Sequence, residues 1–443
     1  MLVAPGLDSV GVWNAVGMRV PITTVAILGA LLLPGLASAA PSALYGVQDD
    51  AWLRAGPGTL DERLDTLEDL NVQIVRYTLR WDRIAAERPA RARDPEDPAY
   101  NWGANDGVLS GLRDRGIPVV LTIWGTPGWA NGGRGPSWAP RSSSTFLNFT
   151  HAAAERFPWV RRWLIWNEPN QQRWFRPASA QVYTRRLLNP AYRVLKSRNE
   201  RNLVGGGVTA PRGHATGVAP VRWIREMKAA RARFDAYAHH PYPLQPGAET
   251  PFTGGCTRSS CLTITMASLE RLLAVVRANF GAKRIWLTEW GYQTNPPEWR
   301  LGVSPALQAR YVSEALLRAW LAPRVDMLVN FLVRDDTFLD GWQSGFITGH
   351  DVVKPSYRAF MLPLAQRSRA GTRTVLWGQV RPRSGRQPYR LQRFVNGRWK
   401  WIGPARWTNA RGVFERPVQA RPGTQFRVWS PRDRELSAVL VVT

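Results

Sequence analysis

Between residues 44 and 365, eight short apolar runs alternate with amphipathic helical stretches, and this alternation constrains the fold most strongly. Apolar runs bounded by turn residues predict strands, whereas a leucine repeat such as that over 60–70 predicts a helix, as do 267–280 and 306–321. The predicted strands are 44–50, 73–81, 117–125, 162–169, 202–209, 234–242, 284–291 and 326–336. Eight strand–helix units in about 320 residues predict an α/β fold, the (β/α)₈ (TIM) barrel. A doubly wound sheet is disfavoured, because no Gly-rich phosphate loop follows the first strand.

A second, smaller unit is expected after the barrel, which we assign to residues 41–365. Residues 366–373 are polar and lack periodicity, which predicts a linker. Residues 374–443 then alternate over short runs, and the Asn396-Gly397 pair predicts a hairpin. This pattern indicates a small immunoglobulin-like β-sandwich.

The N-terminal segment, residues 1–40, resembles a secretory signal. Arg19 provides a positive charge, residues 22–36 are apolar, and a small-residue cleavage pattern follows at 37–39. Residues 1–17 lack this pattern, so translation starting at Met18 is an alternative. A membrane anchor is disfavoured because the apolar run is short and contains a proline, and we expect the protein to be secreted or associated with the cell envelope.

Two cysteines, Cys256 and Cys261, flank four residues of a Gly/Ser-rich loop. In an exported chain this spacing predicts a disulfide that closes a small loop. A pair of free thiols is the alternative. Without nearby histidines, the two cysteines do not predict a zinc site.

The composition is unusual in its 22 tryptophans and its formal net charge of +26. Tryptophan side chains suit stacking on sugar rings, although many are expected in the core. The basic residues are spread along the chain without a nucleic-acid-binding motif, so we do not expect a nucleic-acid partner. Attraction to an acidic polymer and a compositional bias toward Arg both account for the charge.

Two glutamates are expected at the ends of predicted strands. Glu168 ends the fourth strand in "WLIWNEPN", and Glu289 ends the seventh in "IWLTEWG". In a (β/α)₈ barrel these ends meet at one mouth. Cleavage of a glycosidic bond requires such a pair of carboxyl groups. One donates a proton to the leaving oxygen, and the other lies next to the anomeric carbon. A helix-capping role for the Asn-Glu-Pro turn is the alternative for Glu168.

The surroundings of the two glutamates predict different protonation. Trp166 and Pro169 are expected to shield Glu168 and favour its neutral acid, whereas Arg76 on the second strand is placed to keep Glu289 ionised. Asn167 offers an amide to a sugar hydroxyl.

These motifs resemble clan A of the glycoside hydrolases, and within it family 39 and related cellulase-type glycosidases, over residues 44–365. The resemblance implies a (β/α)₈ barrel and hydrolysis with retention of configuration. It implies that Glu168 is the acid/base and Glu289 the nucleophile. It also implies that Asn167 precedes the acid in its usual place and that Arg76 supports the nucleophile.

Further site residues follow from the same resemblance. In "AHHPYP" the resemblance implies that His240 and Tyr242 line the site, with the Tyr hydroxyl near the nucleophile. The tryptophan that clan members commonly carry on the eighth strand is missing, because Phe331 and Arg334 stand there, and Trp342 in the next loop is a candidate substitute.

Other residues have two readings each. Trp124 is expected to be a sugar platform or rim packing. Trp290 has the same two alternatives, and substrate contact is favoured because it follows Glu289. His239 alternates to the opposite face from His240 and is expected to be structural. Asp335 and Asp336 are expected to be solvated or paired with arginines.

The leading hypothesis is a retaining O-glycosyl hydrolase that acts on a β-linked oligo- or polysaccharide, acidic ones included. We expect double displacement without metal or organic cofactor, no stable membrane span, and a monomer. The alternative hypothesis is a non-catalytic carbohydrate-binding or envelope scaffold protein on the same fold. In the C-terminal unit, Trp399, Trp401 and Trp407 could form a carbohydrate-binding face, but we favour a core role because a small sandwich needs bulky residues to fill it.

Overall fold

The computed structural model describes residues 43–443 apart from 257, 259, 339 and 382–384. The predicted signal segment therefore lies outside the described residues. Eight parallel strands close into a barrel in the order β1 to β8, which confirms the predicted TIM-barrel class. These strands are β1 (Leu44–Gln48), β2 (Ile74–Arg80), β3 (Val119–Trp124), β4 (Arg162–Ile165), β5 (Leu203–Thr209), β6 (Ala236–His239), β7 (Arg284–Trp290) and β8 (Val325–Phe331).

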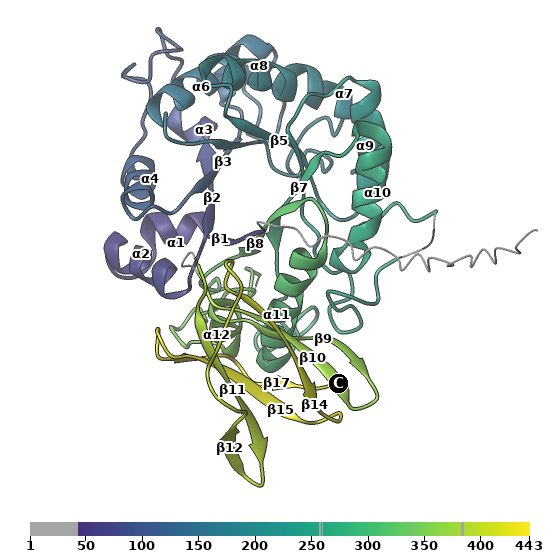
Figure 1. Cartoon of the computed structure of the whole chain (residues 1–443). Helices are drawn as coiled ribbons and strands as arrows, with labels where there is room; N and C mark the ends of the chain where they lie inside the picture. Colours follow the sequence, from purple (N-terminus) through teal and green to yellow (C-terminus); the bar gives the residue numbers. More distant parts are fainter. Residues whose placement is uncertain (1–42, 257, 259, 339, 382–384) are drawn as a thin grey trace, which may run out of the picture. The chain divides into compact units, whose positions relative to one another are not determined.

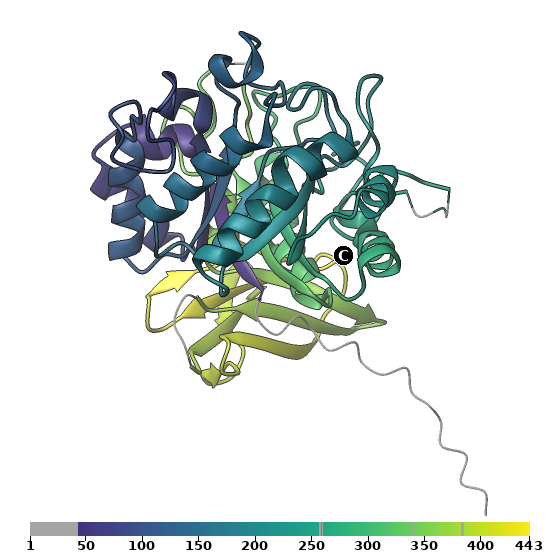
Figure 2. The ribbon, with the colours of Figure 1, turned by 90° about the horizontal axis from the view of Figure 1, so that it is seen from above.

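Helices cover the outside of this barrel (Figures 1 and 2). Those before β5 are α1 (Asp50–Ala55), α2 (Leu60–Asp69), α3 (Trp81–Ile84), α4 (Ala104–Asp114), α5 (Gly128–Asn131), α6 (Ser143–Arg156), α7 (Ala180–Tyr183), the π-helix η1 (Thr184–Leu188) and α8 (Asn189–Arg198). Those after β5 are α9 (Pro220–Ala229), the 3₁₀ turn η2 (Met266–Ser268), α10 (Leu269–Phe280), α11 (Pro305–Leu321) and α12 (Pro355–Met361). Within the described part of the chain, no helix has both the length and the apolar character needed to cross a bilayer.

Local sequence signals explain several helix boundaries. In α2, Thr59 and Glu62 form a reciprocal capping box, and Leu64 and Leu67 are buried one turn apart. The N-cap Ser304 accepts a hydrogen bond from the Leu307 amide at the start of α11. Such caps satisfy backbone amides that have no partner inside the helix.

The side chains that point into the barrel pack together in one cluster, and Trp286 of β7 is its largest member. Its ring occupies space that a side chain on β5 would otherwise fill, since a Cβ on Gly205 would lie 2.7 Å from it. The glycine run in β5 is thus compatible with a strand because its neighbour supplies the bulk. Outward side chains pack against the helices in a separate and larger cluster.

The barrel is closed by a parallel ladder between β1 and β8, from Leu44 opposite Met327 to Gln48 opposite Phe331. Asp49 reinforces this closure. Its carboxylate caps α1 through the Trp52 amide and accepts hydrogen bonds from the Val333 and Arg334 amides that follow β8. One buried carboxylate thereby joins the first strand to the last.

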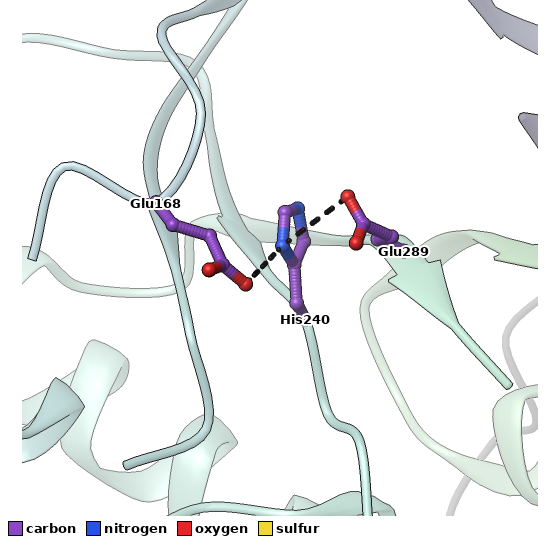
Figure 3. Close-up of side chains that lie close together, drawn as sticks. All are labelled: Glu168, His240 and Glu289. Atoms are coloured by element: carbon purple, nitrogen blue, oxygen red, sulfur yellow. Dashed lines mark hydrogen bonds and ion pairs between the residues drawn. The ribbon is translucent and has the colours of Figure 1, made fainter. Parts of the chain in front are cut away.

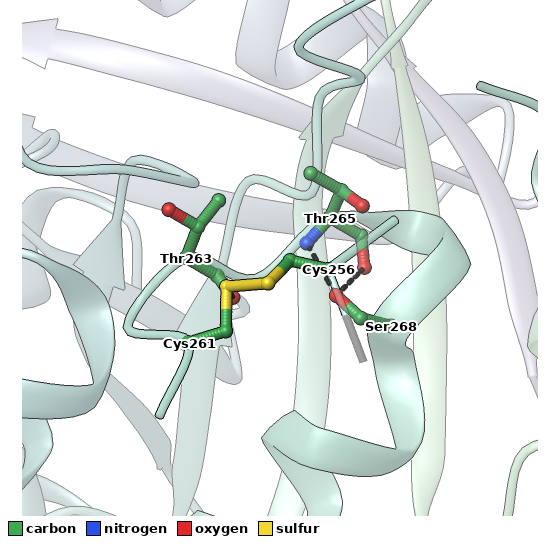
Figure 4. The surroundings of a disulfide bond; sticks show 5 residues. All are labelled: Cys256, Cys261, Thr263, Thr265 and Ser268. Carbon is green, nitrogen blue, oxygen red and sulfur yellow. Dashed lines mark hydrogen bonds between the residues drawn. A yellow bond between two sulfur atoms is a disulfide. The ribbon is translucent and has the colours of Figure 1, made fainter. Parts of the chain in front are cut away.

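The disulfide prediction is confirmed, because Cys256 and Cys261 are bonded with their Cα atoms 6.1 Å apart. The bond closes the loop between β6 and α10 (Figure 4). Immediately after it, the Ser268 hydroxyl accepts a hydrogen bond from the Thr265 amide at 3.0 Å, where η2 begins.

The C-terminal residues form two antiparallel sheets that pack face to face. One sheet has the order β14-β10-β9. The other is built on β12-β11-β15-β16, with β13 paired to β11 and β17 to β15. The strands are β9 (Leu364–Ala370), β10 (Arg373–Gln379), β11 (Pro388–Val395), β12 (Arg398–Trp401), β13 (Arg406–Trp407), β14 (Val413–Gln419), β15 (Gln425–Ser430), β16 (Glu435–Leu436) and β17 (Leu440–Val441).

Two expectations for this region are wrong. The predicted linker at 366–373 lies mostly in β9, which pairs with β10 in an antiparallel hairpin. Its side chains are polar because much of this edge strand is exposed, so the sequence lacks an apolar period.

The predicted hairpin is confirmed, since Asn396 and Gly397 have φ values of 50° and 77° between β11 and β12.

The C-terminal tryptophans are the second correction. Trp401 is 41% exposed and Trp407 59% exposed, whereas the sandwich core consists of other residues, among them Leu376, Leu391 and Phe426. A strand of alternating pattern buries only one face, and the aliphatic side chains and phenylalanines take the inner one.

Candidate active site

The chemically active side chains gather where β2, β4, β6 and β7 end. Figure 3 shows Glu168, His240 and Glu289 converging from three separate segments. One oxygen of each carboxylate and one ring nitrogen of His240 all lie within 4.8 Å of one another. The sequence-based prediction that the two glutamates share one mouth is therefore confirmed.

Glu168 reaches the site through a sharp turn after β4. Trp166 and Glu168 both adopt left-handed backbone conformations, with φ values of 75° and 39°. Each such conformation costs about 1–3 kcal/mol in a residue other than glycine, so the surrounding structure must hold it in place. The buried Trp166 indole supplies one restraint by donating to the Trp174 carbonyl at 2.8 Å.

Glu289 reaches the site through an irregularity in β7. The pairing of β7 with β8 shifts register between Leu287 and Trp290. Leu287 packs outward against the helices, and regular alternation would send Glu289 the same way. The shift allows the Glu289 side chain to turn toward the mouth.

Arg76 connects the groups around the nucleophile candidate. One of its terminal nitrogens donates to Glu289 Oε2 at 2.7 Å, and the other donates to Asn167 Oδ1 at 2.7 Å. Its Nε donates to Thr122 Oγ1 at 3.2 Å, so the guanidinium is held on all sides. The side chain is only 1% exposed, which makes this a desolvated ion pair that orients both partners. The predicted placement of Arg76 beside Glu289 is confirmed, and Asn167 lies on the other side of the same guanidinium.

Tyr242 donates its hydroxyl to the other oxygen of Glu289, Oε1, at 3.0 Å. Burial, and then the charge of Glu289, raise the pKa of the Tyr242 hydroxyl well above its ordinary value, so it remains a donor. Both oxygens of Glu289 thus accept a hydrogen bond from a fixed neighbour, as the sequence-based placement of Tyr242 implies.

His240 bridges the two sides of the site. Its Nε2 lies 3.2 Å from a nitrogen of Arg76, which can only donate, so the ring proton belongs on Nδ1. From there it donates to Glu168 Oε1 at 2.9 Å. Burial lowers the pKa of His240 to about 3, so the ring is neutral at neutral pH. His240 therefore holds Glu168 in place without adding a charge.

Glu168 itself is 14% exposed. Burial raises the pKa of Glu168 to about 7, and the charge of Arg76 opposes that rise only in part. A carboxyl group in this state can donate a proton at neutral pH. The expected division into a neutral acid and an ion-paired carboxylate agrees with this geometry.

His239 points the other way, as expected for a structural histidine. Its Nδ1 lies 2.9 Å from Thr209 Oγ1 and its Nε2 lies 3.1 Å from the Ile264 carbonyl. The two neighbouring histidines therefore have different roles, because successive side chains of an extended chain point to opposite faces at the end of β6.

Two predicted substrate contacts are corrected by their surroundings. Trp290 is 1% exposed and packs edge-on against Tyr292 in the outer cluster, which places it behind the site. Trp124 is 8% exposed, its ring is covered by Arg80 at 4.5 Å, and its indole donates to the Trp174 carbonyl at 3.3 Å. Both tryptophans support the site instead of presenting a free face to a sugar.

Sequence reasoning did not single out Trp174 at all. Its side chain hydrogen-bonds to Glu168, while its carbonyl accepts from two indoles. The only sequence signal was a tryptophan six residues after the glutamate. The segment around it is irregular, so no periodicity predicted where its ring would lie.

Trp342, the loop residue expected to reach toward the site, lies next to Tyr242. Its ring packs edge-on against Tyr242 at 5.3 Å and against Phe331 at 6.0 Å. Its indole nitrogen is buried and has no partner among the described residues. Trp342 thus adds an aromatic wall beside the tyrosine that holds Glu289.

Asp335 is not available as an alternative catalytic acid. It forms a buried ion pair with Lys354, whose Nζ lies 2.9 Å from Oδ2, with the side chains 1% and 3% exposed. The expectation that this aspartate is solvated or arginine-bound is wrong. Asp336 instead accepts the Trp342 amide at 2.7 Å, which helps to position the loop carrying the aromatic wall.

Glu168, His240 and Glu289 are close enough to ligate one metal ion. However, Arg76 already contacts both Glu289 and the histidine ring. A divalent cation would face this buried guanidinium at close range, so the donor set fits an ion-paired organic site better than a metal site.

Comparison with known proteins gives a likeness in fold only. No protein-family model and no curated protein matches the sequence. Among solved structures, CelM2, a bifunctional glucanase-xylanase from a metagenome library, aligns with a TM-score of 0.51 and 11% identity over 92% of this chain and 97% of its own.

Other similar structures align less closely. A β-glucuronidase from Bacteroides uniformis has a TM-score of 0.48 and 12% identity over 92% of this chain and 47% of its own. A psychrophilic family 10 endo-β-1,4-xylanase has a TM-score of 0.46 and 15% identity over 72% of this chain and 96% of its own. This chain thus spans about half the length of the β-glucuronidase. At such identities these likenesses concern the fold, and CelM2 supports the barrel architecture.

Proposed function

We propose that this chain is a secreted glycoside hydrolase that cleaves a β-linked oligo- or polysaccharide with retention of anomeric configuration. The observation that carries the proposal is the placement of the two carboxylates, whose nearest donor atoms lie within 4.8 Å at one barrel mouth. Carboxyl groups about 5 Å apart leave no room for a water between the second carboxylate and the anomeric carbon, which is the arrangement of double displacement. We also propose that the chain is related to clan A of the glycoside hydrolases and, within it, to family 39.

In the first step, a carboxylate oxygen of Glu289 forms a bond to the anomeric carbon while the glycosidic bond breaks. Glu168 transfers its proton to the departing oxygen. In the second step, Glu168 takes a proton from water, the water oxygen attacks the same carbon, and Glu289 leaves. Every atom is supplied by substrate, water and the two glutamates, so no cofactor takes part.

The surrounding residues support these roles. Arg76 and Tyr242 fix the two oxygens of Glu289. Neutral His240 donates to Glu168, and burial keeps the pKa of Glu168 near neutral, at about 7. An acid with a pKa close to the working pH both gives and takes a proton efficiently. The disulfide is consistent with export.

Covalent trapping tests this function. The purified protein is incubated with 2,4-dinitrophenyl 2-deoxy-2-fluoro-β-glycosides of glucose, xylose, mannose, galactose and glucuronic acid. We expect one of them to increase the protein mass by one fluorosugar, on the peptide carrying Glu289. Glu289→Gln should remain unlabelled, whereas Glu168→Gln should still be labelled, because dinitrophenolate leaves without a proton.

Stereochemistry separates the mechanism from its competitors. In Glu168→Gln, azide should restore turnover of the matching dinitrophenyl glycoside and yield a β-glycosyl azide. An α-configured first product would contradict double displacement. Absence of labelling and turnover across the panel would favour the alternative, a non-catalytic carbohydrate-binding protein.

A further inference from the structure

The C-terminal sandwich contains a cleft of about 540 Å³ at one edge of the space between its two sheets. One wall comes from β11, β12 and β15, and the other comes from β14 of the opposite sheet. These strands are labelled in Figure 1. The volume lies within the range of pockets that hold small ligands.

Three cationic side chains line this cleft: Arg393, Lys400 and Arg416. Arg393 is two residues after Leu391, which belongs to the sandwich core, so both face inward. Lys400 lies directly opposite Arg393 in the ladder and shares that face.

The third cation approaches from the other sheet. Arg416 is two residues after Phe414, another core residue, and therefore also points between the sheets. At this edge the apolar core thus gives way to three positive charges from both sheets.

None of these three cations forms an ion pair with another described residue. Among the described residues that line the cleft, none is Asp or Glu. Glu415 lies next to Arg416 but alternates to the other face, where it pairs with Arg367. Arg393 donates to the neutral Gln419 carbonyl at 3.2 Å. Two cations directly opposite each other in a ladder repel, so this arrangement favours an anion between them.

We propose that the cleft binds an acidic saccharide, with the carboxylate or sulfate of one sugar residue held between the cations of Arg393, Lys400 and Arg416. The anion preference stands on the cleft alone, whereas the choice of a saccharide rests in part on the proposed function.

A saccharide fits better than a nucleic acid. Single-stranded nucleic acids are bound in grooves that follow several phosphates and present successive stacking rings. Here the charges converge on one compact cleft, which suits a single anionic group. The site would anchor acidic polymers through the sandwich, separately from hydrolysis at the barrel mouth.

The test measures binding of the full chain to polygalacturonate by affinity gel electrophoresis and isothermal titration. The double variant Lys400→Gln/Arg416→Gln removes two cleft charges. Arg406→Gln/Arg411→Gln is the matched control, since it removes two charges from exposed positions on the same sandwich that do not line the cleft. Neutral xylan and a single-stranded oligonucleotide serve as competing ligands.

We expect the cleft variant to bind polygalacturonate about tenfold or more weakly and the control to stay within about twofold, because bonds to charged groups are the stronger ones. Equal weakening of both variants, equal affinity for xylan or the oligonucleotide, or no binding of polygalacturonate would overturn the proposal. Both variants should hydrolyse a small aryl glycoside at the wild-type rate. A wild-type protein that hydrolyses the aryl glycoside but does not bind polygalacturonate would show that this site fails while the proposed function holds. A wild-type protein that binds polygalacturonate but hydrolyses no glycoside would show the reverse.

Discussion

Glu168→Gln should change how the stability of the folded protein depends on pH. Burial raises the pKa of Glu168 from an ordinary 4.5 to about 7. Between these values the folded protein holds a proton that the unfolded chain has released. Stability from this group is therefore fully present below pH 4.5 and is lost as the pH rises through 7.

The size of the effect follows from the same rise. At about 1.4 kcal/mol for each pKa unit, the wild type should lose up to about 3 kcal/mol of unfolding free energy between pH 4 and pH 8 because of this one carboxyl group. Glutamine has a similar shape and does not titrate. The unfolding free energy of Glu168→Gln minus that of the wild type should therefore rise by up to about 3 kcal/mol over this range.

Urea titrations at closely spaced pH values measure this difference directly. Other buried groups, such as Asp49, are common to both proteins, so their contributions largely cancel. Glu87→Gln is the matched control, because Glu87 is exposed. Its difference from the wild type should stay nearly flat. A flat or falling difference for Glu168→Gln would refute the reasoning that burial keeps this carboxyl protonated.

Three further changes probe other parts of the structure. Arg76→Lys keeps the charge but loses the planar fork that orients the proposed nucleophile, so kcat on a reactive aryl glycoside should fall about a hundredfold; an unchanged kcat would contradict its positioning role. Lys354→Met leaves the buried Asp335 unpaired and should cost about 3–5 kcal/mol in urea unfolding, much of it recovered by adding Asp335→Leu. Replacing Cys256 and Cys261 by serine should cost about 2 kcal/mol, the entropy of a short closed loop, with activity unchanged; loss of activity would show that the loop shapes the site.

Much of the barrel could be predicted from the sequence because its signals are local. Strands with an apolar run and helices with a 3.6-residue repeat are encoded within short windows. The same reasoning located Glu168 and Glu289, because strand ends in such a barrel meet at one mouth wherever they lie in the chain. His239 and His240 were separated correctly by alternation alone.

The errors have a common cause. Trp290 was expected at the substrate and Trp124 either there or in rim packing, yet which face each ring presents depends on the neighbours that cover it. The polar strand over residues 366–373 was taken for a linker because an exposed edge carries no apolar period. Trp401 and Trp407 were assigned to a core that other residues fill.

The amino-acid sequence by itself determined the succession of strands and helices, the barrel class and the identity of the two acids, since each depends on periodicity and spacing along the chain. Only the tertiary structure decided how these acids differ. The register shift in β7 turns Glu289 into the mouth, and burial, opposed in part by the charge of Arg76, raises the pKa of Glu168. The cationic cleft likewise exists only where two sheets meet. Desolvation and charge pairing act between residues that are distant in the chain, so no local pattern encodes them.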